Sequence, residues 1–396
     1  MLKRTCVLTV AGMLTLSLAG CPRGGGQVGW VFDLGHIWDS GSKVSPMGSD
    51  RVLVAGTVKL TPGTVDGPWV FAAEIGLDGK VKRVVDDDPP INVNFGNNAG
   101  LAANASDGSI YLVGNDDEYV PGSEIGMLRV LKVSPTNEVE FDVLLGDMTM
   151  LPGAVKVASS GNLFVSAMRT LGRASHGTII FELNPFGEVL NSILLDEVAT
   201  AHTDIEELQS GSFALTGSSG AATGDDLDFI LSKVDASLQT IDWHLYDLGE
   251  HERGRALAEA PNGDFVIVGT TGSQGAIIRT DSEGNLLWSR TDFLDPNAGN
   301  ESDEVWDVTI TPEGNIAIVG DGTTFDNIAG FFPVITRSSF IALLNPDGDL
   351  IWHTKLWGDA YGLTQTQRGT FMTTGNDPGV RFLTLIEVDM SGHIVN

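Results

Sequence analysis

Residues 260–294 read APNGDFVIVGTTGSQGAIIRTDSEGNLLWSRTDFL. Three short runs in this stretch, Asp264–Gly269, Gly275–Thr280 and Asn285–Arg290, are rich in β-branched and aromatic residues, and turn-forming residues separate them. A fourth run of the same kind, Arg255–Glu259, precedes a Pro-Asn-Gly-Asp turn. This pattern predicts one sheet of four antiparallel strands.

The same unit recurs along the whole chain, and the glycine that ends its second strand marks the period. These markers are Gly56, Gly114, Gly217, Gly269, Gly320 and Gly375, with Ser166 in the equivalent place between Gly114 and Gly217. Four-stranded repeats of this length are typical of β-propellers. We therefore predict an all-β fold, a seven-bladed β-propeller of four-stranded antiparallel blades. Consecutive β-sandwiches are the alternative, although a sandwich does not require so even a period.

The two ends of the repeat array complement each other. Val28–Leu34 (VGWVFDL) resembles the fourth strand of a unit, whereas the last unit, 362–396, ends soon after its third strand. We expect this N-terminal strand to complete the last blade, which would close the ring and leave no long exposed edge. A single propeller domain would then span residues 28–396.

The segment before the propeller has the features of an export signal. Residues 1–20 begin with Lys3 and Arg4 and continue as an apolar run too short to span a membrane, as in a signal peptide. Leu18-Ala19-Gly20-Cys21 resembles the lipobox of bacterial lipoproteins, which implies cleavage before Cys21 and acylation of that cysteine, for example by palmitate. Residues 21–27 would then be the lipidated cysteine and a flexible tether. The alternative is an ordinary signal peptide that happens to carry a cysteine.

Cysteine usage agrees with the lipoprotein interpretation. Cys6 would leave with the signal, so the mature chain would contain Cys21 alone and no disulfide. Pro22 is not the aspartate associated with retention in the inner membrane, so we expect the outer membrane of the bacterial envelope by default. We expect a monomer that meets the membrane through its N-terminal lipid only.

The charge of the chain limits its partners. It has 23 basic and 52 acidic residues and a formal net charge of −29. A protein this acidic is repelled by nucleic acids and by anionic membrane surfaces, and no basic patch offsets the effect. We therefore predict that it binds neither DNA nor RNA.

The longer connections, which follow the second and fourth strands, should share one face of the disc, opposite the tight turns. Variable loops on a rigid scaffold usually carry function. These loops, expected to include Ala167–Gly177 and Asp321–Ser338, mix acidic and aromatic residues, as an interface with an envelope protein or a polysaccharide does. The candidate acidic residues are Asp86, Asp87, Asp88, Asp116, Asp117, Glu118, Asp225, Asp226 and Asp228. For each of them, simple solvation is the alternative.

Two compact polar clusters lie where a loop enters a first strand, near the expected mouth of the central channel. One contains His202, and the other contains His251, Arg253 and Arg255. We assign these residues to binding. A catalytic interpretation would make His251 an acid or base and the two arginines a clamp for a carboxylate or phosphate.

The sequence contains no HExxH motif, nucleophile elbow or P-loop, so we assign no catalytic residue, metal ligand or cofactor. Residues 295–301 resemble a calcium loop, but Trp306 stands where the closing glutamate would fall. Calcium therefore stays open as a weaker alternative. Trp243, Trp288 and Trp352 recur in fourth strands, and we expect them to pack between blades.

The stretch ITPEGNIAIVGDG followed by FIALLNPDGDLIWHTKLWG resembles the β-propeller repeats of secreted bacterial proteins. It is more distantly similar to WD40-like and PQQ-like propellers, including quinoproteins and the outer-membrane assembly lipoprotein. The quinoprotein family carries a vicinal disulfide and the assembly lipoprotein eight blades, and this chain departs from both.

The resemblance implies the fold, whereas such repeats serve enzymes, adhesins and scaffolds alike. We expect a non-catalytic envelope lipoprotein whose loop face binds a protein or polymer. The alternative is a hydrolase or lyase acting on a carbohydrate or ester at the same face. Paired carboxylates about 5 to 10 Å apart across the channel would favour a glycosidase.

Overall fold

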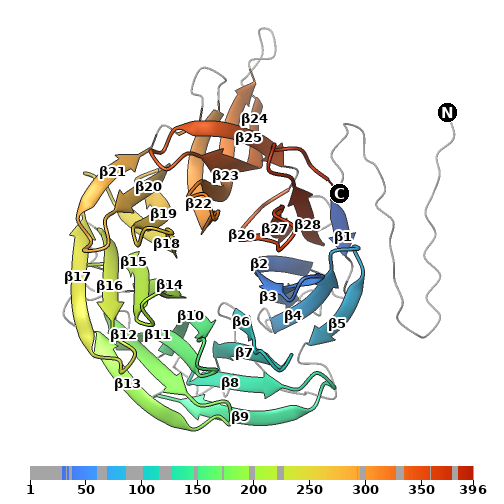
Figure 1. Ribbon diagram of the computed structural model, residues 1–396, viewed down its shortest axis with the longest axis vertical. Helices are drawn as coiled ribbons and strands as arrows, with labels where there is room; N and C mark the ends of the chain where they lie inside the picture. Colours follow the sequence, from blue (N-terminus) through green and yellow to red (C-terminus); the bar gives the residue numbers. More distant parts are fainter. Residues whose placement is uncertain are drawn as a thin grey trace, which may run out of the picture.

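The computed structural model describes residues 29–32, 34, 38–59, 69–85, 101–115, 126–146, 150–171, 174–195, 201–220, 227–291, 293–294, 300–326, 334–356, 358–376 and 382–395. These residues form seven antiparallel sheets of four strands, arranged in a ring (Figure 1). The predicted seven-bladed propeller is confirmed.

Blades are numbered here in chain order, with blade 7 shared by the two ends. Blade 1 comprises β2 (Trp38–Met47), β3 (Arg51–Lys59), β4 (Trp69–Gly76) and β5 (Val81–Val85). Blade 2 comprises β6 (Leu101–Asn104), β7 (Ile110–Asn115), β8 (Leu128–Val133) and β9 (Val139–Leu145). Blade 3 comprises β10 (Met150–Val157), β11 (Leu163–Leu171), β12 (Ala174–Leu183) and β13 (Val189–Leu195). Blade 4 comprises β14 (Ala201–Glu207), β15 (Phe213–Ser218), β16 (Phe229–Val234) and β17 (Thr240–Tyr246).

The stretch quoted first forms most of blade 5. This blade comprises β18 (Glu252–Glu259), β19 (Phe265–Thr271), β20 (Gln274–Thr280) and β21 (Leu286–Arg290). Blade 6 comprises β22 (Asn300–Ile310), β23 (Ile316–Asp326), β24 (Val334–Leu344) and β25 (Leu350–Leu356). Blade 7 comprises β26 (Gly362–Gln365), β27 (Phe371–Asn376), β28 (Leu383–Val388) and β1 (Trp30–Phe32).

Burial follows the order of strands within a blade. The second strands β7 and β19 are buried at every residue, because neighbouring blades cover both faces of the sheet. The fourth strands β13 and β21 form the rim of the disc and are exposed at their first residues. Each gap between blades is therefore filled by its own apolar cluster, such as the one that joins Val266 and Val268 to Ile316 and Ile318.

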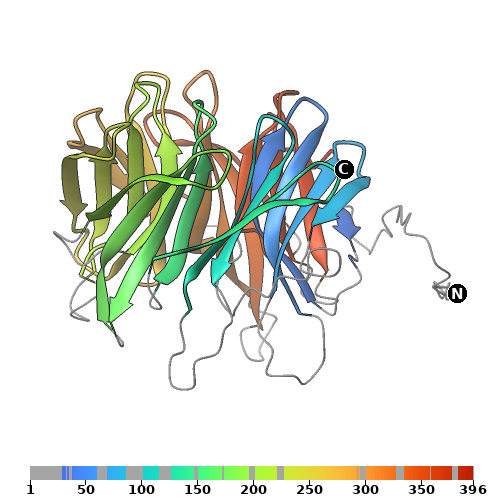
Figure 2. The same ribbon diagram turned by 90° about the horizontal axis from the view of Figure 1, so that it is seen from below.

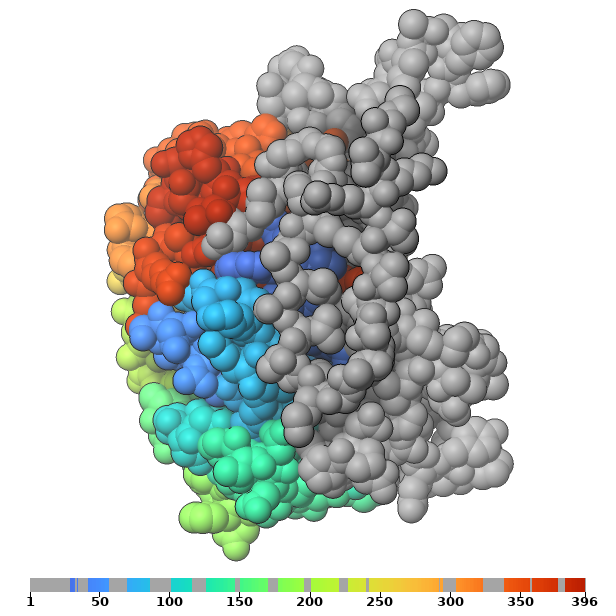
Figure 3. Space-filling model, turned by 90° about the vertical axis from the view of Figure 1, so that its right-hand side faces the viewer, coloured from blue at the N-terminus to red at the C-terminus, as the bar shows by residue number. Residues whose placement is uncertain are grey.

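The N-terminal strand closes the ring as predicted. β1 pairs antiparallel with β28, with Trp30 opposite Leu385 and Phe32 opposite Leu383. Figure 1 shows β1 beside β28, and in Figure 3 the described residues near the two ends of the chain, blue and red, lie on the same side of the disc. Phe32 is buried in the apolar cluster between blades 7 and 1. Closure thus rests on packing as well as on the strand ladder.

At the marker positions Gly217, Gly269, Gly320 and Gly375, toward the end of the second strand, an inner-strand carbonyl lies too close for a Cβ. A Cβ at Gly269 would overlap the carbonyl oxygen of Arg253. The strand register corrects the marker residue of blade 3. Ala167 pairs with Pro152 just before a bulge, as Gly217 pairs with His202 in blade 4, so Ala167 is the equivalent of the marker glycine. Ser166 lies one residue too early in the chain.

The connections alternate as expected between the two ends of the disc. Because the strands of each blade follow one another antiparallel, its two tight turns lie at one end, and the strand ends that its other connections join lie at the opposite end (Figure 2). Two of the expected long loops are shorter than predicted. β11 and β12 extend into 167–177, and β23 and β24 extend into 321–338. Paired backbone hydrogen bonds continue there although the sequence turns polar.

Links between neighbouring blades recur at the tight-turn end. In blades 2, 4 and 5 the penultimate residue of the third strand is a lysine or arginine. Its side chain donates a hydrogen bond to a backbone carbonyl in the turn between the third and fourth strands of the next blade. These links run from Lys132 to Pro185 (3.3 Å), from Lys233 to Ser282 (3.1 Å) and from Arg279 to Pro346 (2.6 Å). They hold adjacent blades in register.

Aromatic rings of the outer strands add a second link at the same end. A Cβ at Gly348, whose φ is +83°, would lie 3.0 Å from the ring of Trp288 in the preceding blade. Trp352 covers Gly392 in the same way, which confirms the packing role of these two tryptophans. Trp243 was wrongly grouped with them: it pairs with Ser232, one residue out of register, and is exposed. His244 provides the ring that covers Gly284.

Candidate functional site

The first strands of the blades face the centre of the ring (Figure 1) and carry a network of charges. Lys43 Nζ on β2 lies 3.8 Å from Asp204 Oδ1 on β14 and 3.5 Å from Asp307 Oδ1 on β22. Asp204 also accepts the backbone N–H of Leu257 (3.0 Å), and Asp307 accepts that of Leu363 (2.9 Å). Each carboxylate thus ties its own blade to the inner strand of the next.

The titration of this network reflects burial opposed by pairing. Burial lowers the pKa of Lys43, but Asp204 and Asp307 together outweigh that effect and raise it, so the ammonium stays charged. Burial raises the pKa of Asp307, and Lys43 partly offsets the rise. Asp204 and Asp307 are the paired carboxylates on which the glycosidase alternative would depend, yet the Lys43 ammonium binds both of them. We therefore regard this network as structural.

The distinctive chemistry lies further out, at the long-loop end of the channel. Arg255, Trp306 and Tyr361 occupy one structural position in blades 5, 6 and 7. Arg255 and Trp306 are the extra residues of matching β-bulges in β18 and β22. Tyr361 holds the equivalent position in blade 7. A Cβ at Gly375 would overlap the carbonyl oxygen of Asp359, as one at Gly269 would overlap that of Arg253, so the residue two positions after Asp359 corresponds to Arg255.

These three side chains form a contiguous half-ring. The Arg255 guanidinium lies 4.6 Å from the centroid of the Trp306 ring, and the Trp306 and Tyr361 rings meet edge to face with centroids 5.2 Å apart. Glu304 holds the guanidinium, with 2.5 Å between Nη2 and Oε1. We call Arg255, Glu304, Trp306, Asp321 and Tyr361 the mouth cluster.

Asp321, on β23, fixes the centre of the mouth cluster. Its carboxylate accepts hydrogen bonds from Trp306 Nε1 (2.9 Å) and from Ser339 Oγ (3.1 Å). Burial raises the pKa of Asp321 to about 6, and the nearby negative charges of Asp359 and Glu304 reinforce the rise despite these donors. The mouth cluster therefore contains a carboxyl group that changes charge near neutral pH.

The mouth cluster is open to solvent in part. About 29% of the Arg255 side chain and 21% of the Glu304 side chain are exposed. Trp306, Asp321 and Tyr361 are half-buried. A planar cation, two aromatic rings and two carboxylates thus present both stacking surfaces and hydrogen-bonding groups to a ligand.

The predicted site residues separate into two groups. Cys21, Asp86–Asp88, Asp116–Glu118, Asp225 and Asp226 lie outside the described residues. Of the others, Arg255 belongs to the mouth cluster, and His251 and Arg253 are exposed at the start of β18. Asp228 lies just before β16, at the same long-loop end of the disc.

His202 lies in the interior rather than at the mouth. Its side chain is 1% exposed, and Nε2 is 2.9 Å from Ser232 Oγ. Burial lowers the pKa of His202 to about 3, so the imidazole stays neutral. This environment suits packing between blades and gives a ligand on the surface no access to the ring.

Sequence reasoning missed Glu304, Trp306, Asp321 and Tyr361. The signal was present, because Arg255, Trp306 and Tyr361 each stand 14 residues before a marker glycine, at Gly269, Gly320 and Gly375. The residues at the same offset in blades 1 and 4 are Ser42 and Thr203. Aligning the units on their glycines therefore reveals which blades carry large side chains at the mouth.

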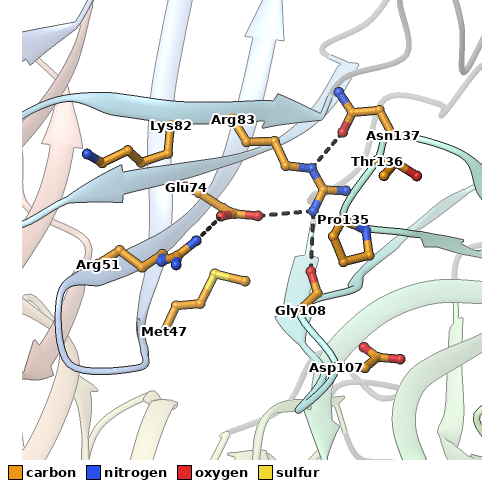
Figure 4. A pocket seen from close by; sticks show the side chains of 10 residues that line it. All are labelled: Met47, Arg51, Glu74, Lys82, Arg83, Asp107, Gly108, Pro135, Thr136 and Asn137. Atoms are coloured by element: carbon orange, nitrogen blue, oxygen red, sulfur yellow. Dashed lines mark hydrogen bonds and ion pairs between the residues drawn. The ribbon is translucent and has the colours of Figure 1, made fainter.

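A pocket of about 500 Å³ opens at the opposite end, between blades 1 and 2 (Figure 4). Glu74 lies at its centre and pairs with Arg51 Nη1 and Arg83 Nη1, each at 3.0 Å. Arg83 also donates to Asn137 Oδ1 (2.6 Å) and to the carbonyl of Ser134. Arg83 thus links blade 1 to the turn of blade 2, as the lysines and arginine described above link other neighbouring blades. The charges at the centre of the pocket are paired with one another.

No protein-family model matches this chain, and no curated protein matches it in sequence. Several solved structures, however, are similar to it in fold. A protein from Lactobacillus plantarum, 13% identical, aligns over 87% of this chain and 94% of its own, with a TM-score of 0.56. These likenesses show a β-propeller.

Two further structures illustrate the range of the fold. The WD40 domain of Neurospora crassa Pan2 is 10% identical over 88% of this chain and 89% of its own, with a TM-score of 0.52. BamB from Moraxella catarrhalis is 11% identical over 86% and 84%, with a TM-score of 0.42. At such identities the likeness concerns the fold alone. Within the described ranges, no helix is long and apolar enough to cross a bilayer.

Proposed function

We propose that this protein is an envelope lipoprotein, acylated on Cys21, whose long-loop face binds a protein or polysaccharide partner through the mouth cluster. One observation carries the proposal. The same bulge position holds Arg255, Trp306 and Tyr361 in three consecutive blades, but Ser42 and Thr203 in blades 1 and 4. The fold therefore does not need large side chains at this position. Their presence in three neighbouring blades supports a role in binding a ligand.

The chemistry of the mouth cluster supports a binding role. Arginine, tryptophan and tyrosine are the residues most enriched where interfaces concentrate their binding energy. Arg255 is held in place by Glu304 and by the Trp306 ring, so it loses little conformational freedom when a partner docks. The strongly negative chain favours a partner that is neutral or basic.

A second candidate function, hydrolysis of a glycoside, has one observation in its favour. Glu304 and Asp321 face each other as register partners on β22 and β23, and burial raises the pKa of Asp321 to about 6. A carboxyl group whose pKa is raised toward neutrality, with a second carboxyl group beside it, is the arrangement that glycosidases use. We rank this function second because Arg255 already pairs with Glu304.

The binding proposal is tested by cross-linking in intact envelopes. The doubly substituted protein Arg255→Ala/Trp306→Ala is compared with wild type and with Phe186→Ser, a control at the tight-turn end where Phe186 is 82% exposed. A Cys21→Ser form serves as the unanchored control. We expect one partner to be captured by wild type and by Phe186→Ser and to be lost from the double variant.

Capture of the same molecules by all three anchored forms would refute the mouth cluster as the contact surface. Hydrolysis is assayed in parallel by the release of reducing ends from envelope polysaccharide. If wild type releases reducing ends, Asp321→Asn does not, and no partner is captured, the result would favour a hydrolase over a binding protein. Recovery of the Cys21→Ser form with the membranes would refute the lipid anchor.

A further inference from the structure

Three carboxylates from different segments converge at the long-loop end of blades 4 and 5. Asp228 precedes β16, Asp247 follows β17, and Glu252 begins β18. One carboxylate oxygen from each lies within 4.8 Å of the other two. We call these residues the acidic trio. It is separate from the mouth cluster and shares no residue with it.

Glu252 is the decisive member of the acidic trio. Its side chain is fully buried, with 0% of its surface exposed. Oε1 accepts a hydrogen bond from Thr271 Oγ1 (2.6 Å) and one from the backbone N–H of Glu250 (3.2 Å). Oε2 is buried too and accepts no well-aligned hydrogen bond from the described residues, although the backbone N–H of Leu248 lies near the carboxylate. A buried carboxylate oxygen left in this state requires a partner, since its desolvation is otherwise uncompensated.

The other two carboxylates are oriented by short local contacts. The backbone N–H of Gly249 donates to Asp247 Oδ1 (2.7 Å), and Ser219 Oγ approaches Asp228 Oδ2 (3.4 Å). These contacts hold the carboxylates close to Glu252 against their mutual repulsion. A cation bound among them would remove that repulsion and would offer the buried Glu252 carboxylate a further partner.

We propose that the acidic trio binds a calcium ion. All three donors are carboxylate oxygens, the hard ligands that calcium prefers. Oxygens that each lie about 2.3 to 2.6 Å from one calcium ion are at most about 5 Å apart, a limit that the trio meets. The larger ion also tolerates irregular geometry, whereas magnesium demands a near-ideal octahedron.

The position of the site indicates what calcium would do. Asp228 and Asp247 flank the third and fourth strands of blade 4, whereas Glu252 begins the first strand of blade 5. The backbone N–H of Glu252 already donates to the carbonyl of Leu227 (2.6 Å). Calcium would therefore strengthen the junction of two blades at the end of the disc where the repeated links of the tight turns are lacking.

The proposal is tested on the whole mature chain. Calcium binding is measured by titration calorimetry on protein first treated with chelator, and thermal unfolding is followed with calcium, with magnesium and with sodium chloride of equal ionic strength. The variants are Glu252→Gln, which keeps the side-chain volume, and Asp247→Asn, which lies at the exposed rim of the site. Asp347→Asn, an exposed carboxylate at the tight-turn end, is the matched control.

We expect calcium at about 100 times its dissociation constant to raise the unfolding temperature of wild type by about 3 °C. The control should behave as wild type, and both trio variants should lose at least ten-fold in calcium affinity together with the temperature shift. If wild type shows neither binding nor a shift beyond that of sodium chloride, the proposal fails. It fails equally if the shift survives in Asp247→Asn and Glu252→Gln, because calcium then binds elsewhere.

Discussion

The two ends of the disc are built from the same strands but differ in how well their polar groups are satisfied. At the tight-turn end the turns repeat one hydrogen-bonding pattern: Gly187 donates to Asn184, Gly284 to Asp281 and Gly348 to Asn345. Among the described residues, buried side-chain atoms without a hydrogen-bond partner lie mostly toward the long-loop end, where they include Asn115 Oδ1, His202 Nδ1, Glu252 Oε2 and Asn376 Oδ1. Near the tight turns, Tyr111 Oη is such an atom.

This difference separates assembly from function. The tight-turn end uses the same short turns and interblade links in blade after blade, so its sequence is constrained by the ring. The long-loop end carries the mouth cluster and the acidic trio, and neither recurs in another blade within the part of the chain that the structure describes. Buried polar atoms without partners are tolerated at sites that bind ligands or ions. Substitutions at the two ends should therefore have opposite consequences for stability and for binding.

Removal of β1 should have the largest effect. Deleting residues 28–34 takes away the pairing with β28 and the buried ring of Phe32, so we expect a loss on the order of 5 kcal/mol in the free energy of unfolding. The edge of β28 would also be exposed to intermolecular pairing. Calorimetry should show a broader transition at lower temperature, and gel filtration should show association. A truncated chain that melts as sharply as the full one would contradict the closure by β1.

The second prediction compares two arginines of blade 5, one at each end. Arg279 is buried, pairs with Asp264 and donates to Pro346, so Arg279→Ala should destabilise the fold by about 3 kcal/mol. Arg255 is partly exposed at the mouth, so Arg255→Ala should cost about 1 kcal/mol or less. Urea denaturation measures both.

Partner capture should reverse this order. At temperatures where both variants are folded, Arg279→Ala should retain the envelope partner and Arg255→Ala should lose it. Equal losses of stability in the two variants would show that the ends of the disc are not specialised as we describe.

The third and smallest effect concerns His202, a buried group at the long-loop end. Its pKa is about 3 in the folded chain and about 6.5 when unfolded, so only the unfolded state takes up the proton as the pH falls below 6.5. Stability from the neutral ring is thus present above pH 6.5 and is lost on acidification. Between pH 6.5 and 5 the loss is about 2 kcal/mol. His202→Gln should therefore show a smaller fall in its urea midpoint than wild type between pH 6.5 and 5. Equal falls in the two proteins would contradict the assignment of this pH dependence to His202.

Much of the fold could be predicted because it is written in short-range patterns. The glycine recurs at Gly217, Gly269, Gly320 and Gly375 because an inner-strand carbonyl leaves no room for a Cβ there. The apolar second strands recur because both their faces are covered. Closure by Val28–Leu34 followed from counting strands. Errors of one residue occurred at Ser166 and Trp243, because the pairing partners that fix the register are not visible in the sequence.

The site could be predicted only in part, because it depends on contacts between blades. Arg255 was chosen for its charge, but Trp306 and Tyr361 look like ordinary strand residues until the bulges of β18 and β22 and the start of β26 bring them together. The acidic trio joins residues before β16, after β17 and at the start of β18. Of these, only Asp228 belonged to an acidic run, and nothing local to Glu252 indicates that its carboxylate is buried.

The pairing of β1 with β28 also sets an order of events in folding. Blades 1 to 6 are each formed by strands consecutive in the chain, so each can assemble soon after it is synthesised or exported. Blade 7 joins the first strand of the domain to the last, across more than 350 residues, and this contact is slow to form because the chain between must already be arranged. Until then both Phe32 and the edge of β28 lie open. The interval before closure is therefore the period in which this chain is most prone to aggregation.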